Sequence, residues 1–152
     1  MRKVLSLLVL TMLSGPAFAA DSVPIASVKA LAPLDNNGGW RPIFDNTPTP
    51  LMRRYFSPPF NQAWTTAMKH NKDFPVFDAD PLTGGQNGGG IKSVSAKMDG
   101  PNRVVAKMTL HDGSERSVEF LMIHSAAGEW FINDIIYPHQ KSLRVVLDDA
   151  GR

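Results

Sequence analysis

The stretch from Lys92 to Tyr137 constrains this chain most, because it reads as four consecutive β-strands joined by short turns. Apolar and polar residues alternate in three segments, as strands with one buried face do: Lys92 to Met98, Arg103 to Leu110 and Ser114 to His124. The Asp112–Gly113 pair between the second and third segments is a strong hairpin signal. The pattern therefore predicts an antiparallel four-stranded meander.

The closing segment, Glu129 to Tyr137, is apolar on both faces, as in a strand that is covered on both sides or borders a cavity. In a regular strand, Asp134 would share a face with Trp130, Ile132 and Ile136. If that face lined a cavity, loss of water would raise the pKa of the Asp134 carboxyl and suit it to general acid or base chemistry. In the alternative interpretation, Asp134 sits at a bulge and accepts a hydrogen bond from a loop backbone.

Helices are expected before and after this meander in the sequence. The expected helices are Pro24 to Leu31, a short helix beginning at Thr49–Pro50, a longer one beginning at Ser57–Pro58–Pro59, and Gln140 to Asp149. The longer one has the clearest apolar stripe, with Phe60, Ala63, Trp64, Ala67 and Met68 at helical spacing. Helices before a meander, without βαβ alternation, predict an α+β fold with N-terminal helices packed on a curved antiparallel sheet.

Residues 1–20 have the features of a cleaved signal peptide. A basic start precedes a short apolar run, and Ala17–Phe18–Ala19 matches the small-residue cleavage site. The alternative, an uncleaved membrane anchor, is disfavoured by the shortness of the apolar run. With no cysteine for lipid attachment, we expect a periplasmic or secreted protein whose residues 21–152 form one domain, with a Pro/Gly-rich connector at 34–49.

Charge and cysteine content narrow the function classes. The chain has 16 Lys and Arg against 14 Asp and Glu, and removing Arg2 with Lys3 leaves 14 of each. Without a clustered basic face, the sequence gives no support for nucleic-acid binding. The absence of cysteine means that the fold is expected to stand without disulfides, which about 130 residues can do.

The order of these elements resembles the nuclear transport factor 2-like superfamily, and within it a group of small bacterial exported proteins of unknown function. The pieces that carry the resemblance are Val28 to Leu31, Asp78 to Thr83 with Gln86–Asn87, Gly128 to Ile135, and Ser142 to Arg144. The resemblance covers most of residues 21–152. It implies a cone-shaped α+β domain with a pocket at its open end, in a superfamily that includes both enzymes and non-catalytic binders.

The region around Asp78 and Asp80 is the sharpest polar feature. These two carboxylates, with Asn87 after them, suggest loop oxygens that could bind a cation such as calcium. The spacing fails the helix–loop–helix calcium pattern, because Leu82 and Thr83 occupy positions that need a ligand and a glycine. The alternative interpretation, which we favour, is that the carboxylates accept hydrogen bonds from the loop backbone. The dispersed histidines predict no metal site, and no cofactor is expected.

The resulting functional hypothesis is a non-catalytic binding or accessory protein that engages a small apolar molecule or a protein partner. The candidate pocket residues are Tyr55, Trp64, Phe77, Trp130, Ile132 and Asp134. One alternative is an enzyme that transfers protons with Asp134 together with either Tyr55 or one Asp of the Asp78/Asp80 pair. Another is an inhibitor or immunity-type protein. A homodimer through the outer face of the sheet, with Leu121, Ile123 and Phe131, is a further expectation.

Overall fold

The computed structural model describes residues 22–35, 43–71, 76–86 and 89–152. The expected signal peptide, residues 36–42 of the connector and Asn87 lie outside these residues. In the described part of the chain, the elements are α1 (Val23–Leu31), η1 (Ala32–Leu34), α2 (Pro50–Tyr55), α3 (Pro58–His70), β1 (Ile91–Met98), β2 (Arg103–Leu110), β3 (Glu115–His124), β4 (Trp130–Ile136) and α4 (Leu143–Ala150). No helix among the described residues is long and apolar enough to span a membrane.

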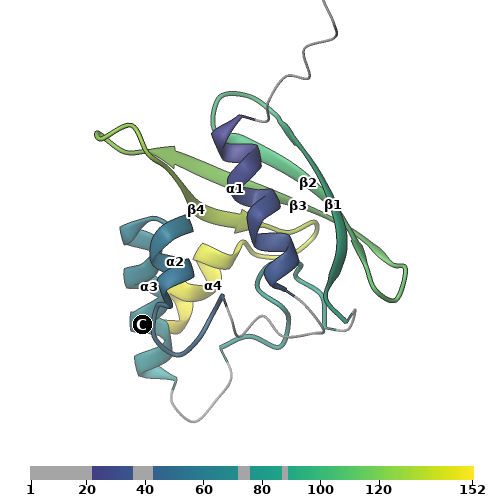
Figure 1. Cartoon of the computed structure of the whole chain (residues 1–152). Helices are drawn as coiled ribbons and strands as arrows, with labels where there is room; N and C mark the ends of the chain where they lie inside the picture. The colour runs from purple at the N-terminus through teal and green to yellow at the C-terminus, as the bar shows by residue number, and fades with distance from the viewer. Residues whose placement is uncertain (1–21, 36–42, 72–75, 87–88) are drawn as a thin grey trace, which may run out of the picture.

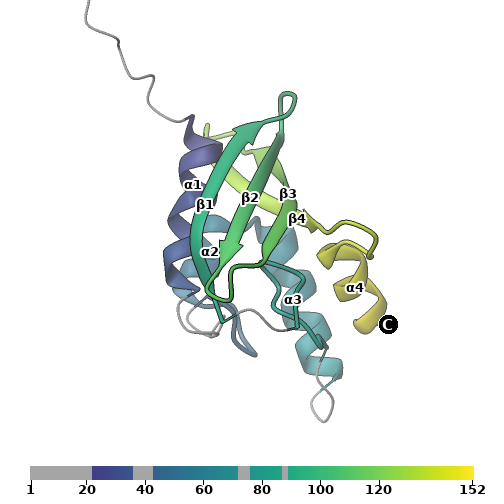
Figure 2. The same cartoon turned by 90° about the vertical axis from the view of Figure 1, so that its right-hand side faces the viewer.

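The four strands form the expected open antiparallel meander in the order β1-β2-β3-β4. Each hairpin turn contains a glycine with a positive φ: Gly100, Gly113 and Gly128. The alternating residues of β2 and β3 that were expected to face inward are buried, as in the pairs Ala106–Val118 and Val104–Phe120. The helices cover this one face, and the other face of the sheet is open (Figures 1 and 2). The α+β architecture predicted from the sequence is therefore confirmed.

A bulge in β4 corrects the expectation of a regular last strand. Leu121 pairs with Asp134, but the next residue of β3 pairs with Ile132, so Asn133 is an extra residue in β4. The inward side therefore changes from even to odd numbers, and Ile132 and Ile135 are both fully buried. Asp134 consequently does not stay on one inward face with its even-numbered neighbours.

Proline and hydroxyl residues set the beginnings of the helices. Three helices have a proline in the first turn, where its missing N–H costs nothing. Three side-chain hydroxyls accept a hydrogen bond from the backbone N–H three residues later: Thr49 from Met52, Ser57 from Phe60 and Ser142 from Val145. Local sequence thus determines where these helices begin.

A group of stacked rings fills the space between α2, α3 and the sheet. We call Phe44, Phe56, Phe60, Trp64 and Phe77 the aromatic core. The Trp64 ring stacks on Phe44 at a centroid distance of 4.9 Å and on Phe77 at 5.2 Å. Its indole Nε1–H donates to the Asp45 carbonyl over 2.6 Å, so the buried ring has a polar partner. The stripe predicted on α3 packs into this group.

The outer face of the sheet is a mixture of apolar side chains and ion pairs. Leu121, Ile123 and Phe131 are half-buried there, because they alternate with or pair beside the inward residues of β3 and β4. No described helix covers this face of the sheet (Figure 2). Arg103 and Glu119 form a cross-strand ion pair at 3.1 Å. The placement of the three apolar residues is compatible with the expected dimer surface, which stays a prediction.

Candidate functional site

Tyr137 directly follows β4, and the loop that contains Pro81 and Gly84 packs against it. Its side chain is 7% exposed, and its hydroxyl donates to the Pro81 carbonyl over 2.5 Å. Gly84 packs directly on the ring, because a Cβ at this position would lie 2.7 Å from the Tyr137 Cδ1 atom. Burial, with the charges of Asp80 and Asp134 nearby, raises the pKa of the Tyr137 hydroxyl, so it remains a neutral donor. We call this region the Tyr137 end.

The loop from residues 80 to 85 is closed by its own backbone and by Asp80. The Asp80 N–H donates to the Gly85 carbonyl over 2.9 Å, and the Gly84 N–H donates to the Asp80 carbonyl over 2.7 Å. The Asp80 carboxylate accepts the Leu82 N–H over 2.7 Å. Asp80 therefore caps this loop as the backbone interpretation of the sequence predicts, and Gly84 uses a positive φ of 66°.

Asp80 also lies against a second carboxyl, that of Asp35, which follows η1. Asp35 is fully buried, and neither of its carboxyl oxygens meets a hydrogen-bond donor among the described residues. Burial, and then the charge and hydrogen bond of Asp80, raise the pKa of Asp35 to about 8; burial also raises that of Asp80. Because burial disfavours a charged carboxylate, Asp35 keeps its proton at neutral pH.

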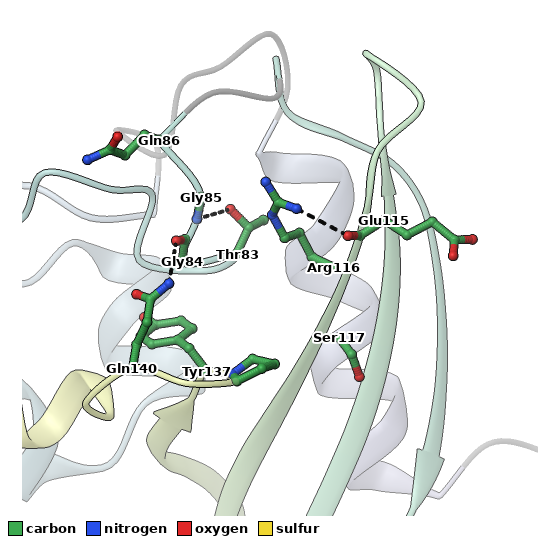
Figure 3. A pocket seen from close by; sticks show the side chains of 10 residues that line it. Thr83, Gly84, Gly85, Gln86, Glu115, Arg116, Ser117, Tyr137 and Gln140 are labelled. Atoms are coloured by element: carbon green, nitrogen blue, oxygen red, sulfur yellow. Dashed lines mark hydrogen bonds between the residues drawn. The ribbon is translucent and has the colours of Figure 1, made fainter.

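Two hollows lie on either side of Gly84 and Tyr137. The first, which we call the apolar cleft, has a volume of about 390 Å³ and is walled chiefly by Val76, Phe77, Tyr137, Leu143 and Val146. Its rim is polar and includes Asp80 and Lys141. The second, the polar groove, has a volume of about 580 Å³ and is bordered by Thr83, Gly85, Arg116, Ser117, Pro138 and Gln140 (Figure 3).

Asp134 lies beside these hollows and caps a helix. Its Oδ1 atom accepts the backbone N–H of Arg144, in the first turn of α4, over 2.8 Å, and that of Ile135 over 2.7 Å. A carboxylate at this position also interacts favourably with the helix dipole. The bulge places Asp134 there, as the second interpretation of the sequence proposed.

The other residues proposed for a pocket do not gather around one cavity. Trp64 and Ile132 are fully buried in packed surroundings. Phe77 stacks on Trp64 and also walls the apolar cleft. The structure thus brings one of these three residues to a hollow.

The remaining aromatic candidates lie elsewhere. Trp130 contacts His124 in a tilted arrangement, with the ring centroids 4.8 Å apart, near the β3–β4 turn. Tyr55, at the end of α2, has the Arg54 guanidinium 5.3 Å from its ring centroid. Both residues are half-buried, and neither lines the cleft or the groove.

The residues proposed to bind a cation also do not come together. Asp78 is exposed and lies at the apolar cleft, Asp80 forms the buried pair, and Asn87 lies outside the described residues. Within the ranges that the structure describes, no three Asp, Glu, His or Cys side chains form a group that could hold a metal ion.

Sequence reasoning missed several residues of the Tyr137 end: Asp35, Arg116, Tyr137 and Gln140. Asp35 opens a run of turn residues, so its type indicated a turn, and its burial depends on a contact with a residue 45 positions away. Arg116 occupies an inward position in the alternation of β3. It was the one local signal that could have indicated this site. A charged residue at an inward position marks a strand end that borders an opening.

Searches with this chain found no matching family model, no matching curated protein and no matching solved structure.

Proposed function

We propose that this protein is a non-catalytic binding or accessory protein that holds a small apolar or amphipathic molecule in the apolar cleft. The supporting observation is the cleft itself, about 390 Å³ in volume, with Val76, Leu143 and Val146 in its wall and Asp80 and Lys141 at its rim. Small-molecule sites are typically about 300–1,000 Å³ hollows with apolar walls and a few polar groups. An amphipathic ligand would place its apolar part against α4.

The proposal includes export and a family. The basic start, apolar run and Ala17–Phe18–Ala19 of the sequence support removal of residues 1–20 and a periplasmic or secreted location. The order of helices and strands supports a place among nuclear transport factor 2-like domains. In the proposed domain, the ligand sits beside Tyr137, and Phe77 is the one ring of the aromatic core that lines its cleft.

Native mass spectrometry of gently purified protein tests for a resident ligand. We expect an added mass of a few hundred daltons that is lost on denaturation. Added laurate, displacing anilinonaphthalene sulfonate as judged by fluorescence, tests the same site directly. Laurate that neither binds nor displaces the dye, with no resident mass, would refute the proposal.

The Val146→Trp substitution locates the site, because a large ring at Val146 fills the cleft. We expect laurate affinity to fall at least tenfold. The matched control is Val145→Trp on the same helix, since Val145 is 44% exposed and points away from the cleft. The laurate affinity of Val145→Trp should stay within twofold of the original. Equal losses of affinity in both variants would show that laurate binds elsewhere.

A second candidate function, proton transfer by Asp80, has one observation in its favour. Asp80 lines the cleft, and burial raises the pKa of its carboxyl. The same mass measurement distinguishes this function, because a resident molecule would be converted on incubation. Conversion that Asp80→Asn abolishes, with binding retained, would assign catalysis.

A further inference from the structure

The two outer edges of the sheet are both protected against pairing with another chain. Along β4, the Ser57 N–H donates to the Ile132 carbonyl over 2.9 Å, and Phe56 forms a parallel bridge there. Along β1, a bulge displaces Lys92 from the ladder, and α1 with η1 packs against the strand. Bulges, lysines and covering segments are the usual means of closing a sheet edge.

The first part of β3 has an edge that is left open. The last pair between β3 and β4 is Glu119 with Ile136, although β3 begins at Glu115. Pro138 would be the next partner, opposite Ser117, but proline has no N–H to donate. In the described part of the chain, no strand therefore continues the ladder beside residues 115 to 117.

The hydrogen-bond pattern shows which backbone groups face this opening. The Leu110 N–H donates to the Ser114 carbonyl over 2.9 Å, and the Met122 N–H donates to the Asn102 carbonyl over 2.7 Å. Antiparallel ladders alternate, so even-numbered residues of β3 point their backbone groups to β2. The N–H and C=O of Ser117 consequently point the other way, into the polar groove.

The side chains give the groove a charge preference. The Arg116 side chain lies toward the loop of Thr83 and Gly85 at the groove, whereas the Glu115 side chain points away from it (Figure 3). The Glu115 carboxylate instead pairs with Lys107 at 2.9 Å. An added strand beside Ser117 would place one of its side chains next to Arg116 on the same face. An acidic side chain fits that position best.

We propose that the polar groove binds a short extended acidic peptide segment of a partner polypeptide, which adds as a strand to the free edge of β3 at Ser117. Main-chain hydrogen bonds would hold the segment, as in other cases of strand addition, and Arg116 would select its acidic residue. The site differs from the apolar cleft in its other lining residues, although the two hollows share Gly84, Gln86, Tyr137 and Gln140.

Fluorescence polarisation with a labelled pentapeptide tests this proposal. The probe alternates valine and threonine and carries a central glutamate; its partner carries glutamine instead. We expect the glutamate peptide to bind at least fivefold more tightly, and Arg116→Gln to remove this difference. Ser117→Pro, which removes the N–H that faces the groove but no bond to β2, should weaken binding at least tenfold. The matched Ser117→Ala keeps that N–H and should bind within twofold of the original.

Amide hydrogen exchange, followed by NMR, gives a readout that needs no variant. The Ser117 amide should be protected when the peptide is added, whereas that of Val118, which faces β2, should not change. The proposal is overturned if neither peptide binds, if Ser117→Pro folds and binds normally, or if glutarate alone displaces the peptide completely. Val146→Trp should leave peptide binding intact, which separates this site from the apolar cleft.

Discussion

The aromatic core and the Tyr137 end lie under the same sheet but are packed in opposite ways. In the aromatic core, Trp64 is fully buried, and its one polar atom has found a partner in the Asp45 carbonyl. At the Tyr137 end, the buried Asp35 carboxyl meets no donor among the described residues, and two hollows remain. One end is filled, and the other is open and holds two carboxyls close together.

We infer from this difference that the aromatic core stabilises the fold and that the Tyr137 end binds a ligand. Ring stacking and complete burial favour one fixed arrangement, because each contact removes apolar surface from water. Buried carboxyls and unfilled space cost stability, and proteins keep such features most often at functional sites. The candidate site therefore belongs at Tyr137, and of the rings that the sequence first suggested, only Phe77 lines it.

The largest expected effect comes from the aromatic core. Trp64→Ala should lower the free energy of unfolding by about 3 to 5 kcal/mol, because it removes a fully buried ring and leaves a cavity. Chemical denaturation measures the loss. Thr65→Ala, at an exposed neighbouring position on α3, is the control and should stay within about 0.5 kcal/mol. A small loss in Trp64→Ala would mean that this end is not tightly packed.

The filled end was also the more predictable from sequence. The stripe on α3 and the alternation in β2 and β3 arise from local periodicity, which a chain displays directly. Hairpin glycines and helix caps are local too, as at Gly113 and Ser57. Local pattern could not decide between a regular last strand and the bulge found at Asn133, because an extra residue leaves the composition of a strand unchanged.

The open end was less predictable because its contacts are distant in sequence. Asp35 meets Asp80 from another segment, and Gly84 fits against Tyr137 across 53 positions of the chain. The sequence showed the glycine run as a loop, but the ring that requires Gly84 lies beyond β4. Residue types alone therefore indicated a loop there and gave no sign of the hollows beside it.

Gly84→Ala, at the Tyr137 end, should lower the free energy of unfolding by less than Trp64→Ala does. The new Cβ would meet the Tyr137 ring at 2.7 Å, and the backbone φ of 66° is strained for alanine. Together these effects should cost about 2 to 4 kcal/mol of unfolding free energy, measured by denaturation. Gly100→Ala has a similar φ of 87° and an open surrounding, so its cost of about 1 kcal/mol isolates the backbone strain. Equal costs at both positions would show that Tyr137 does not press on the loop.

The smallest effect, and the one with opposite sign, is expected at the buried pair. Because the pKa of Asp35 rises from 3.8 to about 8 in the folded protein, the folded state binds more protons than the unfolded state between these pH values. The stability of the original protein should therefore fall as pH rises through this window. Asp35→Asn supplies an amide donor to Asp80 at every pH. It should raise the unfolding free energy at pH 8 by about 1 to 3 kcal/mol and have little effect near pH 4.

Thermal and chemical unfolding across this pH range, with Asp78→Asn alongside, measures the effect. Asp78 is an exposed carboxyl in the same loop, so its substitution should leave both the stability and its pH dependence nearly unchanged. A gain in Asp35→Asn that grows with pH identifies ionisation of the Asp35 carboxyl as its cause, because a packing effect would be constant. A loss of unfolding free energy at pH 8 would instead mean that the ionised Asp35 carboxylate is stabilised. The contrast between a filled end and an open end would then fail.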